Sequence, residues 1–253
     1  MGLTGMLHGR RGPAEIVLVR HGESAGNLAD SAARDADAER LDLPARDADV
    51  ELSSNGVEQG RTLGRWVGGL APAARPDLVV SSPYRRAADT ARAALGELDV
   101  DLLLDERLRE RDLGLLDGLT GKGIRARHPE EAERRSYVGK FYYQPPSGES
   151  WADVVLRVRS LLADLREGYD GQRVWLFTHQ AVIMSFRYAL EGIEEAELLE
   201  IDRTTQIPNA SVTRYRRRDS GLVLDTFADD GHLEPGPAER TAEDDRGGEA
   251  SDG

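Results

Sequence analysis

Short apolar runs that end abruptly in polar residues dominate the pattern of the chain. Four consecutive aliphatic residues at 16–19 lead straight into Arg20 and His21, and further apolar runs occupy 77–82, 101–104 and 174–177. An apolar run this short, without alternation, is typical of a strand buried on both faces of a parallel sheet. The pattern therefore predicts buried strands at 16–19, 77–82 and 174–177 and a shorter strand at 101–104.

Helical periodicity fills the intervals between these runs. A helix is expected to begin with Ser53 or Ser54 as its cap, and another follows Pro83. The clearest helix begins at Ser150, where Asp153 completes a capping pattern ahead of a broad apolar face. These helices alternate with the predicted strands.

The pattern after the fourth strand predicts a helix over 181–190, a short acidic helix near 194–201, and a hairpin made by 211–218 and 221–227. The whole pattern predicts an α/β fold, with a mostly parallel central sheet flanked by helices on both faces and a terminal hairpin. We expect a flexible arm at 1–14 and a single domain at 15–228.

Two segments have weaker patterns. Residues 28–50 are rich in Ala and Asp, which predicts an exposed loop with at most short helices, placed where a substrate-side flap could sit. Residues 120–149 are polar and basic, with aromatic residues near 141–143. An anion-facing lid and a solvated helical hairpin both fit that composition.

The acidity of the chain is concentrated at its end. Residues 229–253 hold nine acidic residues and two arginines, so they account for −7 of the net charge of −13. With little to bury, this segment is expected to be a disordered tail. Its charge disfavours nucleic acid and anionic membrane as partners.

Composition narrows the chemistry. Cysteine is absent, which excludes thiolate metal sites, and five histidines leave little material for a histidine-rich metal site. No segment reaches the roughly 18 apolar residues of a membrane span, so the cytoplasm is the expected location. Catalysis would then depend on imidazole, carboxylate or hydroxyl groups, with no metal or cofactor. The oligomeric state is left open.

Charged and imidazole side chains follow three of the predicted strands. Arg20 and His21 end the first, Arg86 lies just beyond the second, and His179 follows the fourth. Ligands of open α/β sheets bind at the carboxyl ends of the strands. Guanidinium groups hold phosphoryl oxygens bidentately, and an imidazole nitrogen can attack phosphorus. A leaving alkoxide also needs a proton, for which Glu110 is the candidate and Asp112 the alternative.

The order of these motifs resembles the histidine phosphatase superfamily, in its phosphoglycerate-mutase-like branch. The first motif is V-L-V-R-H-G-E-S-A-G-N, at 17–27. The others follow in order, namely L-S-S-N-G-V-E-Q-G (52–60), S-S-P-Y-R-R-A-A-D-T-A (81–91), L-R-E-R-D-L-G-L-L-D-G (108–118), P-P-S-G-E-S (145–150) and F-T-H-Q (177–180). The likeness covers about 15–217, and it implies a metal-independent phosphomonoesterase acting on a small phosphorylated metabolite.

The resemblance assigns the reacting groups. It implies that His21 is the nucleophile, forming a phosphohistidine, and that Glu110 protonates the leaving group and later activates water. For His21 to attack, its imidazole must be neutral, and neighbouring arginines favour that form. Glu110 lies in a charged run, so a solvated carboxylate is the competing interpretation.

The same resemblance implies that the phosphoryl oxygens are held by Arg20, Arg86 and His179, with help from Asn27. Arg86 is preferred over Arg85 because the family pattern R-A-x-x-T begins at the former. We further expect substrate specificity to involve Lys140 and Tyr142, in the basic and aromatic stretch.

Two departures from the family pattern bear on the function. Gln180 stands where the family usually has glycine, and Gly26 stands where glycolytic mutases carry tryptophan. The second departure favours a phosphatase over a mutase, which would return the phosphoryl group to its substrate. A non-catalytic protein that binds phosphorylated ligands on the same fold is the third hypothesis.

Overall fold

The structure is a computed structural model that describes residues 11–96, 98, 100–234 and 236–242. Six strands form one sheet in the order β3-β2-β4-β1-β5-β6. The first four in sequence are parallel, and the last two form an antiparallel hairpin at one edge. The strands are β1 (Glu15–Arg20), β2 (Leu78–Ser81), β3 (Leu102–Leu104), β4 (Arg173–Thr178), β5 (Val212–Arg218) and β6 (Gly221–Asp229). The predicted α/β sheet and terminal hairpin are confirmed.

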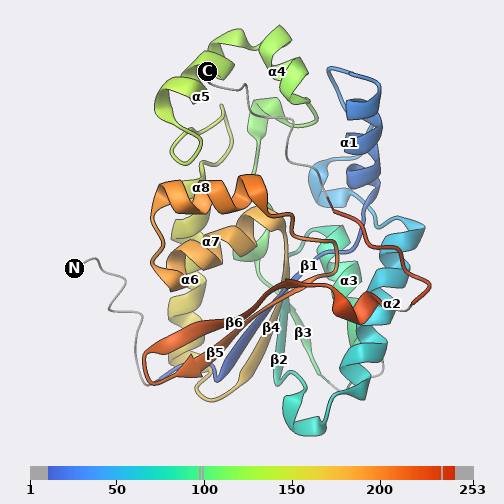
Figure 1. Ribbon diagram of the computed structural model, residues 1–253, viewed down its shortest axis with the longest axis vertical. Coiled ribbons are helices and arrows are strands. Elements are labelled where there is room, and N and C mark those ends of the chain that lie inside the picture. The colour runs from blue at the N-terminus through green and yellow to red at the C-terminus, as the bar shows by residue number, and fades with distance from the viewer. Residues whose placement is uncertain (1–10, 97, 99, 235, 243–253) are drawn as a thin grey trace.

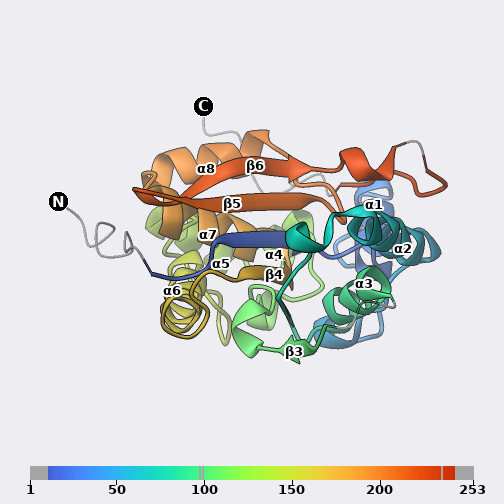
Figure 2. The same cartoon turned by 90° about the horizontal axis from the view of Figure 1, so that it is seen from below.

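Helices cover both faces of this sheet, as Figure 2 shows in the view along its layers. The longer helices are α2 (Ser54–Gly69), α3 (Arg85–Leu95), α6 (Trp151–Gly168) and α7 (Gln180–Glu191). The others are α1 (Ala25–Asp35), α4 (Gly121–Arg127), α5 (Pro129–Val138) and α8 (Glu195–Thr204). Short 3-10 turns join several of these elements, including Asp47–Asp49 and Glu106–Leu108.

Alternation along the buried strands divides the core into two layers. In β1, Ile16 and Leu18 belong to the cluster with α6 and α7, whereas Val17 and Val19 belong to the cluster with α2 and α3. All four side chains are 0% exposed. Burial of each such side chain stabilises the fold by roughly 1.5–3 kcal/mol. Two covered faces explain why these runs show no polar alternation.

Caps fix where the helices begin. The Ser53 side chain accepts from the Gly56 amide, so α2 starts where the sequence predicted. Ser150 and Asp153 form the expected capping box at the start of α6. Removing such a cap typically costs about 1 kcal/mol.

The segment 28–50, predicted to be an exposed loop with at most short helices, begins within a helix of 11 residues. α1 takes up its first residues, because Ser24 and Asn27 form a capping box that starts a helix at Ala25. Only Ala33 of α1 is buried, so the apolar stripe that normally signals a helix is missing. The basic segment that follows residue 120 forms α4 and α5, which lie beyond the carboxyl end of the sheet, opposite α1 (Figure 1).

Residues 229–242 were predicted to belong to a disordered tail, but the described residues among them pack against the rest of the protein. Leu233 is 1% exposed and Ala238 is 7% exposed. Glu239 bonds through its backbone to Asn55 and Gln59 of α2. Residues 1–10 and 243–253, where an arm and a disordered tail were predicted, lie outside the described residues. Among the helices of the described residues, none combines the length and the apolar character needed to cross a membrane.

Candidate active site

Two histidines meet at the carboxyl edge of the sheet. β1 and β4 are neighbours in register, with Arg20 opposite Thr178, so the residues that follow each strand are brought together. The His21 amide donates to the Thr178 carbonyl at 3.0 Å. The rings of His21 and His179 have centroids 5.1 Å apart. The two strand-end histidines predicted from the sequence therefore share one site.

The residue that follows His21 determines which nitrogen of its ring carries the proton. Nδ1 lies 2.7 Å from the Gly22 carbonyl oxygen, which can only accept, so Nδ1 carries the proton. Burial holds the pKa of His21 well below its usual value, and the nearby Arg86 and Arg20 lower it further. A neutral ring protonated at Nδ1 has its free lone pair on Nε2, the atom that can attack an electrophile.

Buried arginines supply positive charge beside these rings. Arg20 is 1% exposed and donates to the Ile207 carbonyl, while Arg86 is 6% exposed. The Arg86 guanidinium bonds to Asp47, with Nη1 2.8 Å from Oδ1 and Nη2 3.3 Å from Oδ2. A carboxylate thus occupies the fork that would suit a phosphoryl group. By contrast, Arg85 is half exposed and pairs with Glu51.

Two glycines allow the loop after β1 to lie against α2. A methyl group at Gly22 would come within 2.6 Å of the Gly56 carbonyl oxygen, and one at Gly56 would overlap the Glu23 carbonyl oxygen. Such a close approach leaves no room for a side chain. The Gly22 amide donates at 2.9 Å to Thr90, whose hydroxyl donates to the Arg86 carbonyl at 2.7 Å. The Thr of R-A-x-x-T therefore ties the arginine helix to the histidine loop.

Glu110 reaches the same site from the loop after β3. Burial raises its pKa to about 6, with the Arg111 amide and Arg86 opposing the rise and Asp47 adding to it. Its Oε1 accepts from the Arg111 amide at 2.8 Å. Arg157 of α6 fastens the loop by donating to the carbonyl oxygens of Arg107 and Glu110. A carboxylic acid that titrates near neutral pH is suited to proton transfer.

His179 is 0% exposed, and the same environment lowers its pKa. Burial is the main cause, and Arg86 and His21 add to it. Its Nε2 lies 2.9 Å from the Ser82 hydroxyl oxygen. Its Nδ1 is buried and has no hydrogen-bond partner in the described part of the chain. Such an atom is available to bond a ligand group.

Asn27 and Asn209 support the loop from the other side. The Asn27 Oδ1 accepts from the Ser24 amide at 2.9 Å, so this oxygen caps α1. The Asn209 Nδ2 donates to the His21 carbonyl at 3.2 Å and lies 3.4 Å from the Asn27 Oδ1. Sequence reasoning did not identify Asn209, Ser82 or Arg157. Position was the only signal for Ser82, which directly follows β2, and for Asn209, which lies shortly before β5, whereas Arg157 lies within α6 and gave no such signal.

The two expected specificity residues differ in their surroundings. Lys140 donates to Asp202 at 2.9 Å, in a pair whose carboxylate side chain is 1% exposed. Gln180, which replaces the usual glycine, reaches the same carboxylate at 3.5 Å through Nε2. Tyr142 is 57% exposed and contacts Phe141 edge to face. The structure thus gives Lys140 a partner within the protein and leaves Tyr142 at the surface.

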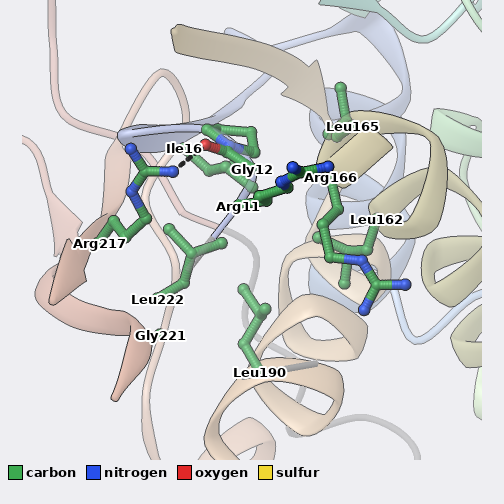
Figure 3. A pocket seen from close by; sticks show the side chains of 11 residues that line it. Arg11, Gly12, Ile16, Leu162, Leu165, Arg166, Leu190, Arg217, Gly221 and Leu222 are labelled. Atoms are coloured by element: carbon green, nitrogen blue, oxygen red, sulfur yellow. Dashed lines mark hydrogen bonds between the residues drawn. The ribbon is translucent and has the colours of Figure 1, made fainter. Parts of the chain in front are cut away.

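No group of three or more potential metal ligands is found in the described residues. The apolar pocket in Figure 3 lies near the start of β1, at the opposite end of that strand from His21. It is lined by Ile16, Leu162, Leu190 and Arg217 among others, and its cavity of about 30 Å³ has room for little more than a water molecule. The candidate site is therefore the histidine and arginine cluster at the carboxyl edge.

The fold defines an α/β protein with a cluster of buried histidines and arginines at the carboxyl edge of its sheet. A family model described as the histidine phosphatase superfamily (branch 1) matches residues 16–230. The chain belongs to this superfamily.

Relatives with known names extend the comparison. A bifunctional protein of Mycobacterium tuberculosis is 38% identical over 133 residues, which is 52% of this chain and 36% of that protein. The chain thus spans about a third of the length of the first curated relatives that it matches. A 2,3-bisphosphoglycerate-dependent phosphoglycerate mutase of Rhizobium etli is 32% identical over 79% of this chain and 90% of the mutase.

Solved structures give the same fold. A mycobacterial glucosyl-3-phosphoglycerate phosphatase in complex with VO3 superposes with a TM-score of 0.68 and 28% identity. The match covers 85% of this chain and 98% of the phosphatase.

Proposed function

We propose that this protein is a metal-independent phosphomonoesterase that works through a phosphohistidine at His21. The observation that carries the proposal is the neutral, buried His21 ring, which holds its proton on Nδ1 and lies close to Arg86, Arg20 and the His179 ring. Phosphoryl transfer requires mainly positioning and stabilisation of charge, which fixed cations supply. Similarity to a mycobacterial phosphatase supports this choice.

In the first half of the proposed reaction, Nε2 of His21 attacks phosphorus as the ester P–O bond breaks. Arg20, Arg86 and His179 hold the phosphoryl oxygens, and protonated Glu110 gives its proton to the leaving alkoxide. In the second half, the Glu110 carboxylate takes a proton from water, whose oxygen attacks phosphorus. The N–P bond breaks, and inorganic phosphate leaves.

The decisive test exchanges His21 for Ala and measures phosphate release and acid-labile phosphoryl labelling of the protein. Both are expected to disappear, whereas His128→Gln, at the partly exposed junction of α4 and α5, is expected to retain both. Hydrolysis at the wild-type rate in the His21 variant would falsify the proposal. Phosphate binding without turnover in the wild-type protein would favour the non-catalytic alternative.

A phosphoglycerate mutase is the second candidate, because the Rhizobium etli relative of that name is 32% identical to this chain. In that reaction the phosphoryl group on His21 returns to a hydroxyl of the substrate instead of to water. Measuring phosphate release against 2- and 3-phosphoglycerate interconversion separates the two. A panel of sugar phosphates, phosphoglycerates, nucleotides and phosphopeptides would identify the substrate class, which we expect to be a small phosphorylated metabolite.

A further inference from the structure

Ser82, which directly follows β2, contacts the second histidine of the site. Both Ser82 and His179 are 0% exposed, and the serine Oγ lies 2.9 Å from the histidine Nε2. The Tyr84 amide donates to the same Oγ at 3.1 Å. Ser82 is therefore a buried hydroxyl with one donor already directed at its oxygen.

The number of available protons decides whether Ser82 or His179 donates the hydrogen bond between them. A serine hydroxyl has one proton to donate, and the described contacts offer it one acceptor, the Nε2 of His179. If Nε2 accepts, the neutral ring must carry its proton on Nδ1. This is the buried nitrogen that has no hydrogen-bond partner in the described residues.

The opposite arrangement leaves two groups unmatched. If Nε2 donated to Ser82, the serine proton would have no acceptor among the contacts described, and the buried Nδ1 lone pair would have no donor in the described residues. Burying polar groups without partners is unfavourable. The first arrangement leaves a single unsatisfied N–H, which a phosphoryl oxygen would satisfy. A lowered pKa keeps His179 neutral at pH 7, so one tautomer persists there.

We propose that Ser82 is a positioning residue that fixes His179 as the Nδ1–H tautomer, so that the ring presents a hydrogen-bond donor to the transferred phosphoryl group. The part that concerns phosphoryl binding rests on the proposed function. The part that concerns the proton does not, because it follows from contacts within the protein.

The tautomer can be read directly by ¹⁵N NMR of the imidazole nitrogens at pH 7.5, with His179 assigned from a His179→Gln spectrum. We expect Nδ1 to be the protonated nitrogen in the wild-type protein. In Ser82→Ala we expect this preference to be lost, with Nε2 protonated in part or in full. Finding Nε2–H in the wild-type protein, or an unchanged tautomer in Ser82→Ala, overturns the proposal.

Binding of inorganic phosphate supplies the functional readout. We expect Ser82→Ala to raise the dissociation constant of phosphate, measured by titration calorimetry, about tenfold, as for the loss of one hydrogen bond to a charged group. Ser82→Thr, which keeps the hydroxyl, is expected to restore it. The control is Ser185→Ala, which removes another fully buried hydroxyl, one that donates within α7 to Ala181.

The two readouts separate the two proposals. A tautomer change in Ser82→Ala without any phosphatase activity in the wild-type protein would support the role of Ser82 and contradict the proposed function. Phosphate affinity that stays at the wild-type value in a folded Ser82→Ala protein would contradict the positioning role. Folding of each variant is checked by its thermal unfolding curve.

Discussion

Arg86 and Asp47 form a bidentate ion pair in the centre of the candidate site. The guanidinium bonds to both carboxylate oxygens, at 2.8 and 3.3 Å, and to the Asp47 carbonyl oxygen at 2.6 Å. Asp47 lies in a short turn between α1 and α2, and its side chain is 39% exposed. Asp47 thus takes three of the five N–H donors of Arg86, so a phosphoryl group that binds Arg86 competes with this carboxylate for the cation.

Exchanging Asp47 for Asn should strengthen phosphate binding, because the neutral amide competes less well for the guanidinium. We expect the inhibition constant of inorganic phosphate to fall roughly two- to fivefold, as for a partly exposed ion pair. Asp49→Asn is the matched control, since Asp49 lies in the same turn but pairs with exposed Arg46. A constant that stays the same or rises in Asp47→Asn contradicts this competition.

The pH dependence of kcat/KM should report Glu110. Its pKa is raised to about 6, and the acid form is needed to protonate an alkoxide, so the rate on an alkyl phosphate is expected to fall as pH rises above about 6. His21 stays neutral across this range, because its pKa is lowered. In Glu110→Gln the rate should drop by roughly 10²–10⁴-fold.

Aryl and alkyl esters separate this effect from ionisation of the substrate, whose second phosphate pKa is also about 6. p-Nitrophenyl phosphate has a good leaving group, so its first step should depend much less on Glu110 than that of an alkyl phosphate. The measured quantity is kcat/KM, which does not include the hydrolysis step that both esters share. Equal losses of kcat/KM on both esters in Glu110→Gln would rule out the acid role.

Thr241 should support the nucleophile loop from the end of the chain. Its hydroxyl donates to the Asn209 Oδ1 at 3.1 Å, and the Asn209 Nδ2 donates to the His21 carbonyl at 3.2 Å. Thr241→Val leaves the buried Oδ1 without this donor, so we expect the free energy of unfolding to fall by about 1–2 kcal/mol and kcat to fall with it. Thr204→Val, on exposed α8, is the control. An unfolding midpoint that does not move would refute the role of Thr241.

Lys140 and Tyr142 should behave differently although both were predicted to set specificity. Lys140→Ala removes the partner of a carboxylate that is 1% exposed, so we expect the free energy of unfolding to fall by about 3 kcal/mol. Tyr142→Ala exchanges an exposed ring and should raise KM with little change in kcat or stability. Denaturant unfolding and Michaelis kinetics of both variants test this contrast. Replacing both members of the pair, as Lys140→Met with Asp202→Leu, should recover most of the stability.

Much of the architecture could be predicted because burial on two faces leaves a clear record in the sequence. The unbroken runs at 16–19 and 174–177 became neighbouring strands, and the caps at Ser53 and Ser150 marked the start of their helices. His21 and His179 could be paired in advance because parallel strands end at the same edge.

The features that were missed depend on contacts between distant parts of the chain. α1 has one buried residue, so its only signal was the Ser24–Asn27 capping box. The partnership of Arg86 with Asp47 joins residues 39 positions apart and leaves no periodic trace. The contacts of Thr241 come from polar groups in a segment whose acidic composition predicted disorder, since composition does not register single hydrogen bonds.

The bond from the His21 Nδ1 to the Gly22 carbonyl has a consequence for the order of events. In the proposed reaction, a His21 ring held through this bond stays in one place, so the departing alcohol and the incoming water use the same face of phosphorus in turn. The rate at which the alcohol dissociates from the site then decides the product. An alcohol that dissociates slowly is rephosphorylated, and one that dissociates quickly leaves the phosphoryl group to be hydrolysed.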